Sequence, residues 1–157
     1  MEKTAEQLAR LAREYLKGEG VEILVRVRGR VGQPIPVEHP RGSITHWFIP
    51  VEVDGRLAGY FLFDSGLIFQ RYSSFLRRAD SVEGAPDRES WTEPARVLKT
   101  AAGAAHAQKL GEPYLTYDGV LARLAWAVPI QSKSGTHVLY VTGDHVYSSS
   151  LSAESTG

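Results

Sequence analysis

Apolar residues recur at helical spacing in two stretches of the chain. The first stretch predicts a helix that begins at the capping pair Thr4 and Gln7 and ends at Gly18. Its apolar face is formed by Leu8, Leu11, Ala12 and Tyr15. The second stretch predicts a helix that begins at residues 90–92 and ends at Gly111. Its face consists of small residues, namely Val97, Ala101, Ala104 and Ala105. Each helix is therefore expected to pack on a sheet through one face.

Elsewhere apolar and polar residues alternate with period two, which is typical of half-buried strands. The predicted strands span residues 21–28, 47–53, 57–63, 67–72, 114–117, 120–131, 136–142 and 145–149. Tight turns at Asp54 and Gly55, and at Gly143 and Asp144, join neighbouring strands into antiparallel hairpins. Residues 29–45 contain three prolines and three glycines. They are therefore expected to form an inserted loop without regular structure.

The segment of residues 46–74 has an echo in residues 121–149. Trp47 and Pro50 each recur 79 positions later, as Trp126 and Pro129. The turn aspartates Asp64 and Asp144 lie 80 positions apart, so the match needs one inserted residue. The helix ends are matched as Gly18 with Gly111. This echo predicts an internal duplication in which the two tryptophans occupy equivalent strands.

These patterns together predict an α+β protein with two tandem repeats. Each repeat is expected to pack one helix on a small antiparallel sheet of about four strands. Residues 1–76 form the first predicted repeat, with the inserted loop at 29–45. Residues 77–90 are a predicted linker, residues 91–150 form the second repeat, and residues 151–157 are a tail.

Composition excludes several classes of function. Eighteen basic and eighteen acidic side chains cancel, so the chain lacks the long-range field that attracts nucleic acid. The absence of cysteine excludes disulfides and thiolate metal sites. No apolar run approaches the ~20 residues that span a bilayer. The N-terminal segment lacks the apolar core of a secretion signal. We therefore expect a soluble, cytoplasmic chain as written, or an extracytoplasmic one if a leader has been removed.

Titratable and nucleophilic side chains are the candidates for chemistry in this sequence. His137, Asp144 and His145 flank one hairpin and are candidate metal ligands, but their spacing is that of a turn and not of a ligand pair. No nucleophile-elbow, dinucleotide or phosphate-loop motif occurs. The carboxylates near these positions all lie at predicted turns, where side chain to backbone hydrogen bonds explain them; they are Asp54, Asp64, Asp118 and Asp144. We therefore expect no catalytic residue, no metal and no cofactor.

The second half carries short motifs of a known family. The segments are residues 114–119 (YLTYDG), residues 124–128 (LAWAV) and residues 140–144 (YVTGD). They resemble the PepSY family and the related propeptide modules of thermolysin-like metalloproteases, although Thr142 stands where those modules have an aspartate. The resemblance implies a non-catalytic module that inhibits, chaperones or binds a partner, often a protease. It transfers no catalytic residue to this chain.

Aromatic residues crowd the first predicted sheet and occupy both of its faces. One face carries Trp47, Phe61 and Phe63, and the other carries Phe48, Tyr60 and Leu62. The first helix can cover only one face, so the other is expected to meet the second half, another copy of the chain or a ligand.

The leading hypothesis is a non-enzymatic binding or inhibitory module that engages a protein partner, such as a peptidase, or a second copy of itself through a sheet edge. Candidate partner-binding residues are Phe69, Gln70 and Tyr72 on the predicted outer strand, and Arg26 and Arg28 in a basic row with Arg30. The alternative is a small-molecule-binding protein or enzyme with a pocket between sheet and helix. That pocket would have the basic row and residues 29–45 at its mouth. A core filled by side chains favours the first hypothesis.

Overall fold

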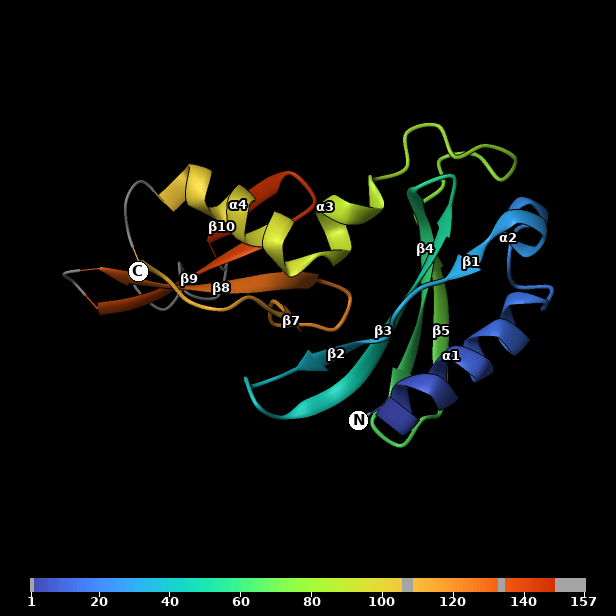
Figure 1. Ribbon diagram of the computed structural model, residues 1–157, viewed down its shortest axis with the longest axis horizontal. Coiled ribbons are helices and arrows are strands. Elements are labelled where there is room, and N and C mark those ends of the chain that lie inside the picture. The colour runs from blue at the N-terminus through green and yellow to red at the C-terminus, as the bar shows by residue number, and fades with distance from the viewer. Residues whose placement is uncertain (1, 106–108, 133–134, 149–157) are drawn as a thin grey trace. The chain divides into compact units, whose positions relative to one another are not determined.

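The computed structural model describes residues 2–105, 109–132 and 135–148 (Figure 1). The helices are α1 (Glu2–Leu16), α2 (Ile23–Arg28), α3 (Arg88–Thr92) and α4 (Pro94–Ala105). The strands are β1 (Arg30–Val31), β2 (Ile35–Glu38), β3 (Ile44–Val53), β4 (Arg56–Asp64), β5 (Phe69–Ser74), β6 (Lys109–Leu110), β7 (Tyr114–Tyr117), β8 (Leu124–Ser132), β9 (Gly135–Thr142) and β10 (His145–Ser148). The predicted tail, residues 151–157, lies outside the described residues.

Hydrogen bonds connect the strands into one ten-stranded mixed sheet. The strand order is β10-β9-β8-β7-β2-β3-β4-β5, with β1 paired to β3 and β6 paired to β8. β2 and β7 run parallel, with Val37 opposite Leu115. The prediction of two tandem repeats, each with one helix on its own sheet of about four antiparallel strands, is therefore wrong. Period-two alternation identifies a strand but carries no information about which strand lies beside it.

Contacts divide the chain into two compact units. Unit 1 comprises Met1–Pro36 and Ile44–Arg88, and unit 2 comprises Val37–Ser43 and Glu89–Gly157. Residues 37–43 thus belong to unit 2 although unit 1 precedes and follows them in the sequence. Unit 1 holds α1, α2, β1, β3, β4 and β5, whereas unit 2 holds α3, α4 and β6 to β10.

The predicted strand at residues 21–28 is a helix. In α2, the Arg26 N–H donates to the Glu22 carbonyl at 2.9 Å and the Gly29 N–H donates to the Val25 carbonyl at 2.7 Å. Val25 is fully buried, whereas Val27 is 77% exposed, so the two valines do not share one buried face. Packing of Val25 in the core overrides the strand preference of a β-branched segment.

The predicted loop at residues 29–45 contains two strands and the start of a third. β1 pairs with β3, with Val31 opposite Val51. β2 includes Pro36, and β3 already begins at Ile44. The prolines misled the prediction because short strands with few ladder bonds tolerate proline.

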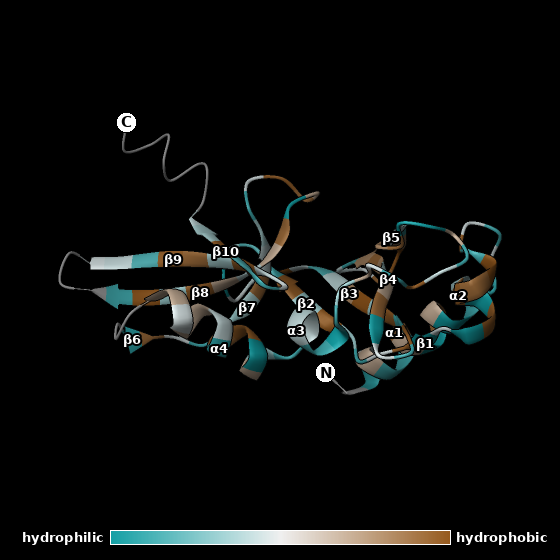
Figure 2. Cartoon of the chain, turned by 90° about the horizontal axis from the view of Figure 1, so that it is seen from above, coloured by the Kyte–Doolittle hydropathy of each residue, from teal (hydrophilic) through white to brown (hydrophobic). Residues whose placement is uncertain are grey.

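α1 and α2 cover one face of the β3-β4-β5 part of the sheet (Figure 1). The core they enclose consists of Leu8, Ala12, Leu16, Val21, Val25, Trp47, Ile49, Val51, Val53, Ala58, Phe61 and Phe63. Figure 2 shows apolar residues as brown segments along β3. Full burial of each large apolar side chain contributes roughly 1.5–3 kcal/mol. The predicted apolar face of the first helix is confirmed at Leu8 and Ala12, which are fully buried.

The opposite face of the β3-β4 hairpin is also buried. Phe48 and Leu62 are fully buried, and the Phe48 and Tyr60 rings stack with centroids 4.5 Å apart. The segment after β5 contributes to the cover of this face, because the Phe75 ring lies with its centroid 5.7 Å from that of Tyr60. The predicted two-sided burial is therefore confirmed, and one chain suffices to produce it.

The sequence echo coincides with a backbone hydrogen bond that joins corresponding residues in each of the two units. The Gly32 N–H donates to the Pro50 carbonyl at 2.8 Å, and the Gly111 N–H donates to the Pro129 carbonyl at 2.8 Å. Gly32 and Gly111 are 79 positions apart, as are the two prolines. Gly111 therefore corresponds to Gly32 and not to Gly18, the residue matched with it in the sequence.

Candidate functional site

β5 is the terminal strand of unit 1. Among the described strands it pairs only with β4, with Gly59 opposite Ser74 and Phe61 opposite Tyr72. The candidate residues Phe69, Gln70 and Tyr72 all lie on this strand. The structure therefore places these three predicted residues together on a sheet edge.

The ladder between β4 and β5 determines which backbone groups of β5 point outward. The Phe75 N–H donates to the Ala58 carbonyl at 2.8 Å. Opposed residues of an antiparallel pair alternate between hydrogen-bonded and non-hydrogen-bonded positions. By this alternation Ser73 bonds to β4, and the backbone groups of Tyr72 and Ser74 point away from it. The backbone N–H and C=O groups of Tyr72 and Ser74 are therefore oriented to pair with an added strand.

Phe69 and Gln70 have different roles at this edge. The Phe69 ring stacks on Tyr15 with centroids 4.2 Å apart and meets Phe63 edge-on at 5.8 Å. Gln70 is exposed at a register irregularity, and its side-chain amide donates to Asp64 Oδ2 at 3.3 Å. Phe69 is therefore half-buried against the core, whereas the side chain of Gln70 is exposed.

Tyr72 and Ser74 are joined by one carboxylate. The Tyr72 hydroxyl donates to Glu22 Oε1 at 2.9 Å, and the Ser74 hydroxyl donates to Glu22 Oε2. Burial, together with the hydrogen bond to Glu22, raises the pKa of Tyr72 above its usual range. Tyr72 therefore stays a neutral hydrogen-bond donor at physiological pH.

Arg26 and Arg28 do not lie in one row, as the predicted strand would have placed them. Residues two apart on a helix point about 200° apart, so Arg26 and Arg28 diverge. The Arg26 Nε donates to the Val21 carbonyl at 2.9 Å, whereas Arg28 forms an ion pair with Asp54. Arg26 and Arg28 thus line different hollows of the surface.

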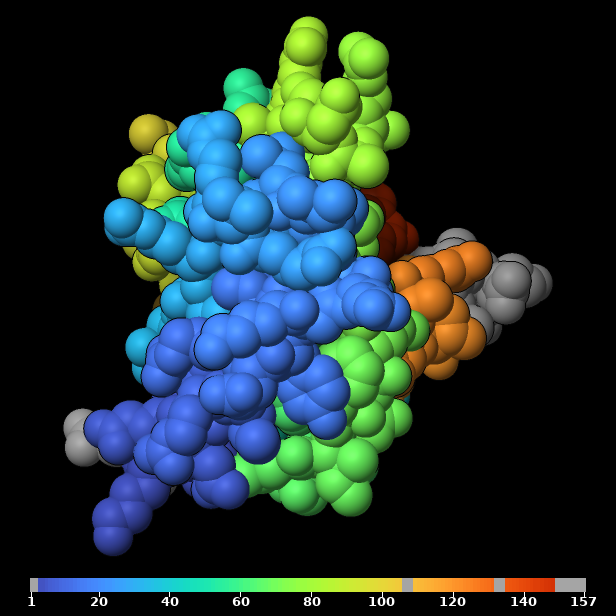
Figure 3. Space-filling model, turned by 90° about the vertical axis from the view of Figure 1, so that its right-hand side faces the viewer, coloured from blue at the N-terminus to red at the C-terminus, as the bar shows by residue number. Residues whose placement is uncertain are grey.

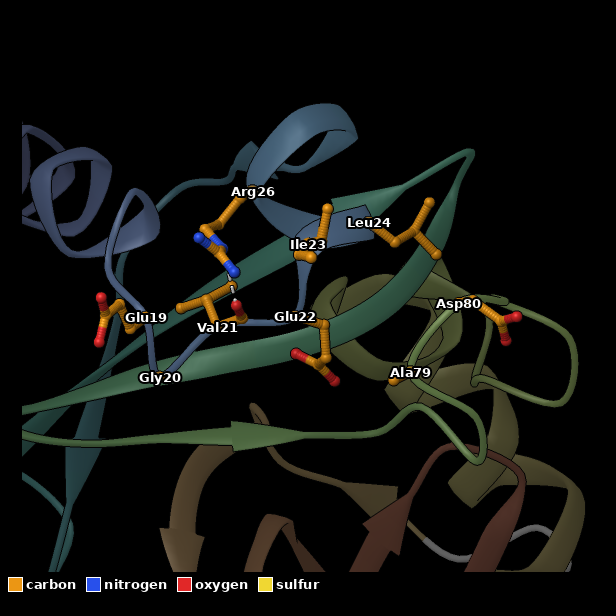
Figure 4. A pocket seen from close by; sticks show the side chains of 9 residues that line it. All are labelled: Glu19, Gly20, Val21, Glu22, Ile23, Leu24, Arg26, Ala79 and Asp80. Carbon is orange, nitrogen blue, oxygen red and sulfur yellow. Dashed lines mark hydrogen bonds between the residues drawn. The ribbon is translucent and has the colours of Figure 1, made fainter.

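A hollow of about 700 Å³ lies beside α2 (Figure 4). Its lining residues are Glu19, Gly20, Val21, Glu22, Ile23, Leu24, Arg26, Ala79 and Asp80. In Figure 3 the light-blue residues of the α2 region and the yellow-green residues near position 80 lie side by side on this face of unit 1. Sequence reasoning missed this hollow, because a strand at residues 21–28 would have placed Ile23 on the same face as Val25. The structure leaves Ile23 70% exposed.

Charge in this hollow is mostly negative. Three carboxylates, those of Glu19, Glu22 and Asp80, oppose one guanidinium, that of Arg26. Within the described part of the chain, neither Glu19 nor Asp80 forms an ion pair. The hollow therefore combines aliphatic walls with a surplus of negative charge, which favours a cationic group with an apolar stem.

The histidines do not form a metal site in the described residues. No group of three or more His, Cys, Asp or Glu side chains is close enough there to hold a metal ion. His145 lies opposite Thr142 on β9. His137 is five residues further along the same strand, roughly 17 Å away at 3.4 Å per residue.

Unit 2 has its own polar cluster at residues 37–43. The His39 ring stacks on Tyr117 with centroids 4.1 Å apart, and its Nδ1 lies 3.3 Å from Thr116 Oγ1. The Arg41 guanidinium lies 5.1 Å from the centroid of the Tyr114 ring. These contacts hold residues 37–43 against β7.

No family model, no curated protein and no solved structure matches the chain. None of the helices in the described ranges combines the length and the apolarity that crossing a bilayer requires.

Proposed function

We propose that the chain is a non-enzymatic binding or inhibitory module of PepSY-like kind that engages a protein partner, such as a peptidase. The partner contributes an extended segment, which adds to β5 as a further strand. The observation that carries this proposal is the one-sided pairing of β5, with outward backbone groups at Tyr72 and Ser74. In such strand addition, main-chain hydrogen bonds supply affinity and side-chain pockets supply selectivity.

The filled core favours this proposal over a small-molecule site. The space between α1, α2 and the sheet is occupied by fully buried side chains such as Leu8, Val25 and Phe61. A small-molecule-binding protein or enzyme with a pocket between sheet and helix remains the second candidate. The hollow beside α2 supports it through its volume alone, because no histidine, serine or cysteine lines that hollow.

Proline at position 74 tests the edge directly. Ser74→Pro removes the outward N–H and the hydroxyl, whereas the matched control Ser74→Ala removes only the hydroxyl that bonds Glu22. Random nine-residue peptides displayed on phage are selected on the wild-type chain, and enriched peptides are synthesised for fluorescence titration. We expect wild type and Ser74→Ala to bind within about threefold of each other. Ser74→Pro is expected to lose at least about tenfold, since a main-chain bond contributes roughly 0.5–1.5 kcal/mol and the proline ring also blocks the edge.

Fold controls separate binding from stability. Ser74→Pro should retain the circular dichroism spectrum, because its N–H points away from β4. Ser73→Pro should unfold more easily, because its N–H bonds to β4. Sedimentation velocity of the wild type tests self-pairing: a dimer that Ser74→Pro abolishes would identify a second copy as the partner. Enriched peptides that bind Ser74→Pro as well as wild type would contradict the proposal.

A further inference from the structure

The hollow beside α2 adjoins the C-terminal end of β5. Glu22 lines the hollow and at the same time accepts hydrogen bonds from the Tyr72 and Ser74 hydroxyls. Ala79 and Asp80, which follow β5 in the chain, form its other wall (Figure 4). The hollow and the edge are thus two parts of one surface of unit 1.

Strand geometry directs one side chain of an added segment toward this hollow. The side chains of Tyr72 and Ser74 project to the face on which Glu22 lies, because both bond that carboxylate. A residue placed directly opposite either of them projects its side chain to the same face, about 5 Å away. Its side chain therefore lies next to Glu22.

The walls and charges of the hollow select the kind of side chain. Val21, Ile23, Leu24 and Ala79 provide aliphatic walls, and Ile23 and Ala79 are exposed. The carboxylates of Glu19 and Asp80 have no cationic partner among the described residues. Arg26 is turned toward the Val21 carbonyl, away from Asp80 (Figure 4). A long aliphatic stem that ends in a cation matches both features.

We infer that the hollow is the selectivity pocket of the β5 edge and takes a lysine or arginine side chain of the added segment. This inference rests on the proposed function, because it assumes strand addition at β5. The stem of the basic residue packs on Ile23 and Leu24. Its cationic head lies near Asp80 and Glu22, where the negative charge is unbalanced.

A peptide scan tests this selectivity. The probes are synthetic nonapeptides of alternating threonine and valine, each carrying one lysine at one of the nine positions, with methionine and glutamate versions of each. For at least one position, we expect the lysine peptide to bind the wild-type chain at least about tenfold more tightly than the glutamate peptide. The preference should weaken as salt rises, because the charges are partly exposed. Asp80→Lys should reverse the order of the lysine and glutamate peptides at that position.

Gly20 allows the hollow to be filled without disturbing the fold. A Cβ at Gly20 meets nothing within 4 Å. Gly20→Leu therefore places an aliphatic side chain in the lining, and Gly20→Ala serves as the matched control. We expect Gly20→Leu to abolish the lysine preference while leaving the binding of threonine-valine peptides within about threefold, and Gly20→Ala to retain the preference.

The outcomes distinguish the pocket from the edge. Equal binding of lysine, methionine and glutamate peptides to wild type, with binding still lost in Ser74→Pro, would overturn the pocket and leave the edge intact. An unchanged lysine preference in Gly20→Leu and in Asp80→Lys would also overturn it. Failure of every peptide to bind would overturn both the edge and the pocket.

Discussion

The β1-β3-β4 region of unit 1 and the β6-β8-β9 region of unit 2 share a backbone contact but differ in how their hairpins close. Both regions place a glycine N–H on the proline carbonyl of the longer strand at 2.8 Å. In unit 1 the register shifts between Val51 and Glu52, so β4 carries one extra residue, whereas β8 and β9 pair without a shift. Trp47 is opposite Phe63, and Trp126 is opposite Val141.

This difference corrects the sequence match. Phe63 and Val141 are 78 positions apart, so the extra residue lies in the first hairpin. Asp64 directly follows Phe63 in β4, whereas Asp144 lies in the turn between β9 and β10. The two aspartates are therefore not at equivalent positions. A bulge adds a residue to one hairpin and a longer turn adds residues to the other, so the two changes shift the sequence alignment in opposite directions.

The helices that precede the two regions also differ. In unit 1 the longer helix, α1, comes first, and in unit 2 the longer helix, α4, comes second. The predicted small face of the second helix is confirmed at Val97, Ala101 and Ala105, which are buried, but Ala104 is exposed. Similar hairpins can therefore be covered by different helices. An apolar sheet face must be buried, but it does not determine which helix buries it.

Replacement of the two tryptophans should produce the largest effect and tests whether the regions are equivalent. Trp47 and Trp126 are 5% and 3% exposed. Trp47→Ala and Trp126→Ala should each lower the free energy of unfolding by about 3–5 kcal/mol. Urea denaturation measures this, with the exposed His145→Ala as a control expected within about 0.5 kcal/mol of wild type.

A phenylalanine at the same positions sharpens the comparison. Trp126 Nε1 donates to the Trp91 carbonyl at 2.7 Å. Trp126→Phe removes this buried hydrogen bond and should cost about 1–3 kcal/mol on that account. Equal losses in Trp47→Phe and Trp126→Phe would show that this bond contributes nothing.

Glycine substitutions should have intermediate effects and separate the regions. A Cβ at Gly59 would lie 2.6 Å from the Ser73 carbonyl oxygen, whereas a Cβ at Gly32 or Gly111 would approach its proline ring at 3.0 or 3.2 Å. Gly59→Ala must therefore displace β5 and should cost more than about 2 kcal/mol, and the other two should cost about 1 kcal/mol each. Thermal unfolding gives the order. A larger loss in Gly111→Ala than in Gly59→Ala would contradict the packing of Tyr72 and Ser73 over Gly59.

The smallest expected effect is a pH dependence confined to unit 1. Burial lowers the pKa of His46, and Arg71 adds to this, while Asp64 opposes it. Because the folded state binds the proton less readily than the unfolded chain, stability should fall as pH drops below about 6.5. Residue 125, which is 79 positions after His46, is alanine. Denaturant midpoints at pH 7.5 and 5.5 should differ less in His46→Gln than in wild type. An equal difference would assign the pH dependence to other groups.

The sequence by itself determined the strands with strong alternation and the contacts within hairpins. The predicted strands at residues 47–53, 57–63 and 114–117 coincide with β3, β4 and β7 to within a few residues. The recurring Trp and Pro were found from spacing alone. The outer position of β5 was also anticipated, because consecutive hairpins place the last strand at an edge.

Tertiary structure alone decided the state of residues 21–28, the use of residues 29–45 and the hollow beside α2. A β-branched segment with alternating arginines satisfies a strand pattern, but burial of Val25 under the sheet selects a helix. β1 and β2 are too short for periodicity to reveal, and they form because β3 and β7 offer them partners. The candidate pocket combines Ile23 and Leu24, which a strand would place on opposite faces, with Asp80, which is distant from them in sequence. The spacing of apolar residues in the sequence predicts local hydrogen bonds and burial. Which strands are neighbours, and where hollows form, depends on contacts between residues far apart in the chain.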